Sequence, residues 1–221
     1  VDPTELEGID IVVALDVSNS MQDRDLLPNR LEAAKRVIDG FIQRRKSDRI
    51  GLVVFGKEAF TQCPLTLDYR ALRGMLADVR FGLIDGQGTA IGNALGTALN
   101  RLRKSDAKSR VIILLTDGDS NAGNLAPTQA AKYAQSLGVK VFTILVGSDV
   151  AGPGPDRMGI YRGAPRHPVN PKLLEEIAQA TGGTPYLATD TAALEQRFQA
   201  ILEDLDTSRL KDQTVSYVEL Y

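Results

Sequence analysis

The sequence contains a single cysteine among its 221 residues and has no apolar run long enough to cross a membrane. One cysteine, Cys63, excludes an intramolecular disulfide and a thiolate metal cluster built by this chain alone. It has no activating neighbour in the sequence, so we interpret it as a structural thiol. Spanning a bilayer takes roughly 18 or more consecutive apolar residues, and the chain opens without a charged-then-apolar signal segment.

The chain also lacks an excess of charge of either sign. Its formal net charge is −2 and its pI is about 5.5, so no global field attracts nucleic acid or an anionic membrane. Hydrophobic residues at 43% and charged residues at 24% are ordinary for a globular protein. We expect a lead-in at 1–7, one domain over 8–205 and a polar tail at 206–221.

Motifs for hydrolysis and nucleotide binding are weak. The only histidine, His167, lies in a long loop at 148–169, and no G-x-S-x-G elbow is present. Gly86, Gly88 and Gly92 are spaced G-x-G-x-x-x-G, one residue away from the dinucleotide fingerprint, and no convincing strand precedes them. We interpret these glycines as a tight turn followed by close helix packing.

Short runs rich in valine and isoleucine predict strands that are buried on both faces, as in parallel sheets. These runs are residues 9–16, 49–55, 110–116 and 139–146. Two weaker extended segments follow. Residues 59–65 are expected to form a hairpin with the second strand at a sheet edge, and residues 184–189 to supply a last short strand. Amphipathic helical patterns begin at Pro28 and recur at 68–79, 89–104, 127–137, 171–181 and 191–205. The alternation predicts a three-layer α/β domain.

The charged positions of the helix that begins at Pro28 fall between its apolar ones. They are Arg30, Lys35, Arg36, Arg44 and Arg45. We interpret them as a solvated face rather than a binding patch.

Polar residues follow two of the predicted strands. Asp16 and Asp117 end apolar runs, and Thr89 stands at the start of a helix. Ligands of open parallel sheets bind beyond the carboxyl ends of the strands, where these segments are expected to converge. If the turn after the first strand stays extended, Ser18 and Ser20 project to the same side as Asp16. Carboxylates and hydroxyls are hard oxygen donors that suit Mg²⁺ or Mn²⁺ better than zinc or copper.

Two other interpretations of these residues stay open at this point. Ser18 and Ser20 are also typical helix caps, and Asp16 is typical of a turn hydrogen bond. A haloacid-dehalogenase-like phosphatase also places a nucleophilic aspartate at the end of its first strand. Such an enzyme needs an acid two residues later, where this chain has Ser18, although Asp117 and Asp119 could still hold a metal.

Three ordered motifs resemble those of von Willebrand factor A domains. Asp16-Val17-Ser18-Asn19-Ser20-Met21 is similar to the D-x-S-x-S element, Gly88-Thr89-Ala90 to the threonine loop, and Leu115-Thr116-Asp117-Gly118 to the second aspartate. The resemblance covers roughly residues 8–205. It implies a Rossmann-like three-layer fold with a mostly parallel sheet, one antiparallel edge strand and helices on both faces.

The resemblance also implies a metal-ion-dependent adhesion site. Ser18 and Ser20 would bind the metal through their hydroxyls, and Thr89, Asp16 and Asp117 directly or through water. Mg²⁺ is the expected ion, with Mn²⁺ and Ca²⁺ as alternatives. In this family a carboxylate of a partner protein fills the remaining position, so the resemblance implies binding without catalysis.

Three further stretches resemble BatA-like bacterial aerotolerance proteins. They are residues 28–35, 48–55 and 60–69. In those proteins the domain lies between transmembrane helices, which implies anchorage in a bacterial inner membrane, a periplasmic domain and a juxtamembrane connector at 206–221. The implied partners are other Bat-type proteins and a MoxR-type AAA+ ATPase system in envelope or stress tolerance.

Two features depart from the family pattern. Asp119 adds another carboxylate near the site, and the loop at 148–169 is hypothesised to help select a partner. An alternative to the metal-dependent function is a structural domain with an empty metal site, which assembles through its helix faces or this loop.

Overall fold

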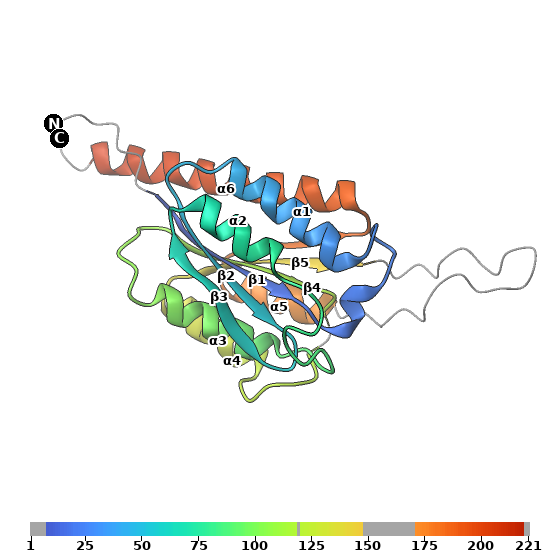
Figure 1. Ribbon diagram of the computed structural model, residues 1–221. Helices are drawn as coiled ribbons and strands as arrows, with labels where there is room; N and C mark the ends of the chain where they lie inside the picture. The colour runs from blue at the N-terminus through green and yellow to red at the C-terminus, as the bar shows by residue number, and fades with distance from the viewer. Residues whose placement is uncertain (1–7, 119, 148–170, 219–221) are drawn as a thin grey trace, which may run out of the picture.

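The computed structural model describes residues 8–118, 120–147 and 171–218, with side chains as far as residue 205. A six-stranded sheet lies between two layers of helices (Figure 1). The strands are β1 Asp10–Asp16, β2 Arg49–Phe55, β3 Ala59–Thr66, β4 Arg110–Thr116, β5 Lys140–Val146 and β6 Pro185–Ala188. The helices are α1 Arg30–Gln43, α2 Tyr69–Ala77, α3 Ile91–Leu102, α4 Pro127–Ser136, α5 Pro171–Ala180 and α6 Thr191–Val218. A short 3₁₀ helix, η1, spans Asn19–Gln22.

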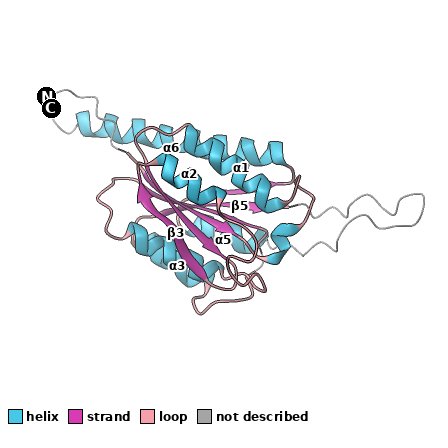
Figure 2. Cartoon of the chain, viewed as in Figure 1, coloured by secondary structure: helices cyan, strands magenta, loops and turns pink. Residues whose placement is uncertain are grey.

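The strands follow the order β3-β2-β1-β4-β5-β6, and only β3 is antiparallel to its neighbour. Figure 2 shows the sheet with helices on both sides. The predicted three-layer α/β fold with one antiparallel edge strand is confirmed. The chain passes from β1 to β2 on one side and later places β4 on the other side of β1. The strand order therefore reverses between β1 and β4.

All seven residues of β1 are buried, as the continuous apolar run predicted. Because side chains alternate across a strand, the two faces of β1 enter two cores. Val13 and Leu15 pack in a core with α1, α2 and α6. Val12 and Ala14 pack in a second core with α3, α4 and α5. Both faces of the central strands are thus covered by helices. Only the ends of these strands, where the loops begin, remain for binding a ligand.

The last helix is longer than the sequence pattern predicted. The pattern predicted a helix at 191–205, whereas α6 continues to Val218. The sequence has no glycine or proline between these ends, so no backbone signal stops the helix where the apolar pattern fades. The predicted boundary between the domain and its connector, at residue 205, falls inside this helix.

Cys63 lies within β3, where it is buried opposite Leu52. Burial raises the pKa of its thiol. The thiolate is the nucleophilic form of cysteine, so this environment supports the interpretation as a structural thiol.

Candidate functional site

The two predicted acidic ligands come to one rim of the sheet. Asp16 is the last residue of β1, and Asp117 directly follows β4. The two strands are parallel neighbours in which Leu15 lies opposite Leu115. Both acids therefore lie where the strand order reverses, which is the usual ligand position in an open α/β sheet.

The carboxylate of Asp16 is fixed through both of its oxygens. Its Oδ1 accepts a hydrogen bond from the backbone N–H of Ser18 at 2.8 Å, and its Oδ2 accepts one from the hydroxyl of Thr116 at 2.7 Å. All three residues are buried. The sequence signal for Thr116 was its place inside the motif Leu115-Thr116-Asp117-Gly118, but sequence reasoning gave a role there to Asp117 alone.

The two serine hydroxyls lie next to each other. The Oγ atoms of Ser18 and Ser20 are 3.0 Å apart, within hydrogen-bonding distance. The turn does not stay extended, because η1 begins at Asn19 and its tight winding brings the second hydroxyl back beside the first. Ser18 occupies the N-cap position of η1, yet its side chain makes no capping hydrogen bond. The hydroxyl of Ser18 therefore does not cap η1, whereas the turn hydrogen bond that the alternative interpretation expected of Asp16 is present.

The threonine loop is bound to the same rim. Ala90 donates its N–H to the carbonyl of Gly56, just after β2, at 2.7 Å. Asn19 donates to the carbonyl of Gly86 at 3.0 Å. A Cβ on Gly86 would lie 2.5 Å from Oδ1 and 3.2 Å from the backbone nitrogen of Asn19, so the two segments pack closely here. Thr89 is buried, and it precedes α3 instead of starting it as predicted.

Asn121 joins the threonine loop to the loop that follows β4. Its Oδ1 accepts the N–H of Thr89 at 2.9 Å, and its own N–H donates to the carbonyl of Thr89 at 3.1 Å. Sequence reasoning gave Asn121 no role, because a loop asparagine carries no periodic signal. Asp119, the extra predicted carboxylate, lies outside the described residues, as do His167 and the predicted loop at 148–169.

Burial and charge repulsion act together on Asp16. Removal from water, followed by the nearby charge of Asp117, raises the pKa of its carboxyl to about 7. Hydrogen bonds from Ser18 and Thr116 act in the opposite direction. Asp117 is already paired with the guanidinium of Arg30 at 3.1 Å, so the cost of burial falls mainly on Asp16, and a bound cation would relieve it.

The donor set fits a hard divalent cation. In the part of the chain that the structure describes, no three His, Cys, Asp or Glu side chains gather as a metal site. The candidate set instead combines two carboxylates with hydroxyls, and oxygen donors of these kinds suit Mg²⁺ and Mn²⁺. The five residues that would hold the ion are Asp16, Ser18, Ser20, Thr89 and Asp117.

The structure corrects the prediction for the charged face of α1. Arg30 was expected in solvent, but it is fully buried and its guanidinium contacts Asp25 and Asp117. Arg45 is buried too, in an ion pair with Asp48. The helical period marks both as polar positions. It does not show that acids from other segments surround them.

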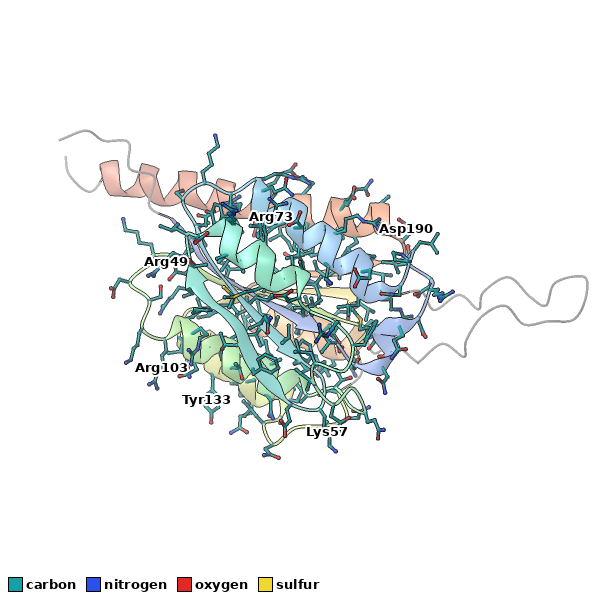
Figure 3. All side chains as sticks on the ribbon, viewed as in Figure 1. Arg49, Lys57, Arg73, Arg103, Tyr133 and Asp190 are labelled. Carbon is teal, nitrogen blue, oxygen red and sulfur yellow. The ribbon has the colours of Figure 1, made fainter. Side chains whose placement is uncertain are left out.

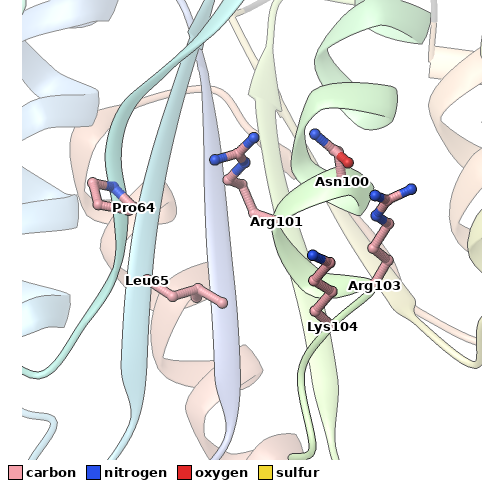
Figure 4. Close-up of a pocket in the computed structure, with 6 residues that line it drawn as sticks. All are labelled: Pro64, Leu65, Asn100, Arg101, Arg103 and Lys104. Carbon is pink, nitrogen blue, oxygen red and sulfur yellow. The ribbon is translucent and has the colours of Figure 1, made fainter.

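A separate hollow of about 390 Å³ lies at the other end of the sheet (Figure 4). It is lined by Pro64, Leu65, Asn100, Arg101, Arg103 and Lys104. Figure 3 shows Arg103 at the same end as Arg49, whereas Lys57 follows β2 at the end that carries Asp16. Three cationic side chains repel a metal ion, so this hollow is not part of the candidate site.

Residues 10–200 match the sequence model of the von Willebrand factor type A domain. The chain belongs to this family. It is 37% identical over 202 residues to an uncharacterised protein of Borreliella burgdorferi, and the match covers 89% of this chain and 58% of that protein. This von Willebrand factor A domain thus spans less than two thirds of the relative.

Two solved structures resemble the domain in sequence and in fold. BatB from Bacteroides thetaiotaomicron is 32% identical with a TM-score of 0.72, covering 89% of this chain and all of that one. An aerotolerance-related membrane protein from Bacteroides fragilis, solved with multiple mutations to serines, is 31% identical with a TM-score of 0.74; the match covers 90% of this chain and 100% of that one. The predicted resemblance to Bat-type aerotolerance proteins is confirmed. Among the described residues, no helix is both long and apolar enough to cross a bilayer.

Proposed function

We propose that this domain is a metal-dependent protein-binding module. Asp16, Ser18, Ser20, Thr89 and Asp117 hold a divalent cation, and a partner protein supplies an Asp or Glu carboxylate to it. The observation that carries the proposal is the buried pair of acids beside two adjacent serine hydroxyls. Arg30 already pairs with Asp117, but Asp16 is costly to bury as a charged acid, and its carboxylate beside the two hydroxyls is complementary to a metal cation.

The composition of the site supports a role in binding another carboxylate. Three of its five side chains are neutral hydroxyls, so the two acids at most balance the charge of a divalent ion. An ion with few anionic ligands still attracts a further negative group, and Mg²⁺ exchanges some of its waters while it keeps octahedral geometry. The domain therefore binds an acidic side chain, and we assign it no catalytic step.

The setting of the domain is also part of the proposal. The similar Bacteroides fragilis structure is that of an aerotolerance-related membrane protein. That likeness supports a membrane-anchored bacterial protein, and we propose that the domain lies at the periplasmic face of the inner membrane. Other Bat-type domains and a MoxR-type ATPase system are its proposed partners, with the metal site as the point of contact.

A carboxylate probe tests the proposal without a known partner. The chelator-stripped domain is loaded with Mn²⁺, and the relaxation of water protons reports the waters that remain on the ion. Acetate is expected to displace a bound water and reduce the relaxation enhancement, whereas acetamide, which has the same shape and no charge, leaves it unchanged. The Asp16→Asn variant gives the background of unbound Mn²⁺. Equal effects of acetate and acetamide would contradict carboxylate binding.

A further inference from the structure

The buried guanidinium of Arg30 lies directly behind the candidate metal site. We propose that Arg30 determines which divalent cation the site prefers, because it holds one oxygen of Asp117 and so disfavours chelation of a metal by both oxygens of that carboxylate. Arg30 is a positioning and selectivity residue in this proposal and does not itself contact the ion. The inference rests on the proposed metal-dependent function.

The contacts of Arg30 are directional and buried. Its Nε and Nη2 each lie 2.8 Å from an oxygen of Asp25, a bidentate pair that fixes the plane of the guanidinium. Its Nη1 donates to Oδ2 of Asp117 at 3.1 Å and lies 3.5 Å from the carbonyl oxygen of Ser20. Arg30 therefore contacts two of the segments that form the site.

The surroundings prevent Arg30 from turning away. A Cβ on Gly147, at the end of β5, would lie 2.7 Å from Nη2 of Arg30, so the guanidinium rests against bare backbone. The backbone N–H of Arg30 donates to the carbonyl of Asp23 at 3.0 Å, and the side chain of Asn29 caps the start of α1. With Asp25 bound in a fork, Nη1 faces Asp117 at 3.1 Å, with the carbonyl of Ser20 at 3.5 Å and Oδ2 of Asp23 at 3.6 Å.

This geometry limits how the two acids can bind a metal. Both oxygens of Asp16 already accept hydrogen bonds, and Oδ2 of Asp117 accepts one from Arg30. An oxygen that accepts one hydrogen bond keeps a second lone pair, so each acid can still bind an ion through one oxygen. Chelation of an ion by both oxygens of one carboxylate would compete with these hydrogen bonds. Ca²⁺ takes six to eight oxygen ligands and often uses bidentate carboxylates, whereas Mg²⁺ takes six in a compact octahedron. The hydrogen bond from Arg30 therefore favours Mg²⁺ over Ca²⁺.

Two substitutions release Asp117 in different ways. Arg30→Lys keeps the charge, but one ammonium cannot bind Asp25 in a fork and reach Asp117 as well. Arg30→Met combined with Asp25→Asn removes the forked ion pair and avoids an uncompensated buried acid at position 25, while Asp23 and Asp117 lose their contact with Arg30. Arg45→Lys is the matched control, since Arg45 is also a buried arginine of the α1 region paired with an acid, Asp48.

The test is calorimetric titration of each chelator-stripped protein with Mg²⁺ and with Ca²⁺, after thermal unfolding has shown that each variant is folded. The ratio of the Ca²⁺ Kd to the Mg²⁺ Kd is expected to fall about tenfold in the lysine variant and in the double variant, and to stay unchanged in the control. Loss of affinity for both ions with an unchanged ratio would assign Arg30 a structural role only and overturn this inference. Failure of the unsubstituted domain to bind either ion would contradict the proposed function, and the inference with it.

Discussion

Thr116 donates its hydroxyl to Oδ2 of Asp16 at 2.7 Å, across the two central strands of the sheet. The same oxygen of Thr116 accepts the N–H of Gly118 at 3.1 Å. One hydroxyl thus links the acid at the end of β1 to the backbone that carries Asp117. Thr116 supports the candidate site without being one of its predicted ligands.

The first prediction concerns this hydroxyl. Thr116→Val keeps the shape and removes the donor, so Asp16 loses one of the two hydrogen bonds that orient it. Loss of an outer partner of this kind typically lowers metal affinity about 10- to 100-fold, and calorimetric titration with Mn²⁺ measures it. Thr116→Ser should retain the affinity.

Thr143→Val is the control for that prediction. Thr143 is a buried threonine of β5 whose hydroxyl donates to the carbonyl of Leu174 at 3.1 Å, away from the two acids. Its loss should lower stability while metal affinity stays the same. Equal losses of affinity in the two valine variants would show that Thr116 acts only on the fold.

The second prediction concerns the pH dependence of stability without metal. The pKa of Asp16 rises from 3.8 to about 7 on folding, so between these values the folded state holds a proton that the unfolded state has lost. Stability from this group is present below pH 4 and is lost as pH rises through 7, by a total on the order of 4 kcal/mol. Asp16→Asn keeps a side chain that can form both hydrogen bonds, and it removes the charge.

Urea unfolding in a chelator at pH 5, 6, 7 and 8 checks this dependence. The asparagine variant should gain stability over the unsubstituted domain as pH increases. Asp39→Asn serves as a flat control: the hydrogen bond from Arg73 lowers the pKa of Asp39 below 3.8, so this acid is ionised in both the folded and the unfolded state at pH 5 to 8 and its effect on stability should not change with pH. If the stability difference between the Asp16→Asn variant and the unsubstituted domain were the same at all four pH values, the raised pKa of Asp16 in the folded state would be contradicted.

The third prediction concerns Asn121. Asn121→Ala leaves the N–H of Thr89 without its 2.9 Å acceptor, and loss of this part-buried hydrogen bond should cost about 0.5–1.5 kcal/mol. The threonine loop should loosen and metal affinity should fall, as measured by Mn²⁺ titration. Asn124→Ala, an exposed position in the same loop, should change neither quantity. Unchanged metal affinity in the Asn121 variant would show that metal binding does not depend on how the threonine loop is held.

The fourth prediction concerns the docking of α6. The rings of Phe41 and Phe198 meet edge to face with centroids 5.4 Å apart, and both side chains are buried. Phe198→Ala should lower the free energy of unfolding by about 3–5 kcal/mol. Tyr133→Ala, at an exposed aromatic position, should stay within about 0.5 kcal/mol. Chemical denaturation measures both, and a small effect at Phe198 would show that α6 adds little to the core.

Much of the fold followed from apolar periodicity alone. The runs that became β1 and β4 are continuous because both faces of these strands are covered. The rim position of Asp16 and Asp117 followed from the rule that ligands gather at the carboxyl ends of parallel strands. The predicted end of the last helix, residue 205, was wrong, since α6 continues to Val218. A helix that extends beyond the core no longer needs an apolar face, so the apolar pattern stops before the helix does.

The supporting residues of the site could not be predicted in the same way. Arg30 occupies a polar position of a helix, and nothing local tells a solvated arginine from one surrounded by acids of distant loops. Thr116 lies 100 residues from its partner Asp16, and Asn121 lies 32 from Thr89. Such pairs depend on how the loops meet at the rim, which periodicity does not encode.

The most direct test of a cation at this rim is calorimetric titration of the chelator-stripped domain with Mg²⁺ and Mn²⁺. The unsubstituted domain and Asp106→Asn, an exposed acid in the loop between α3 and β4, should each bind one ion saturably, and Asp16→Asn should bind none. Equal binding by all three proteins, or by none, would contradict a metal site built on Asp16.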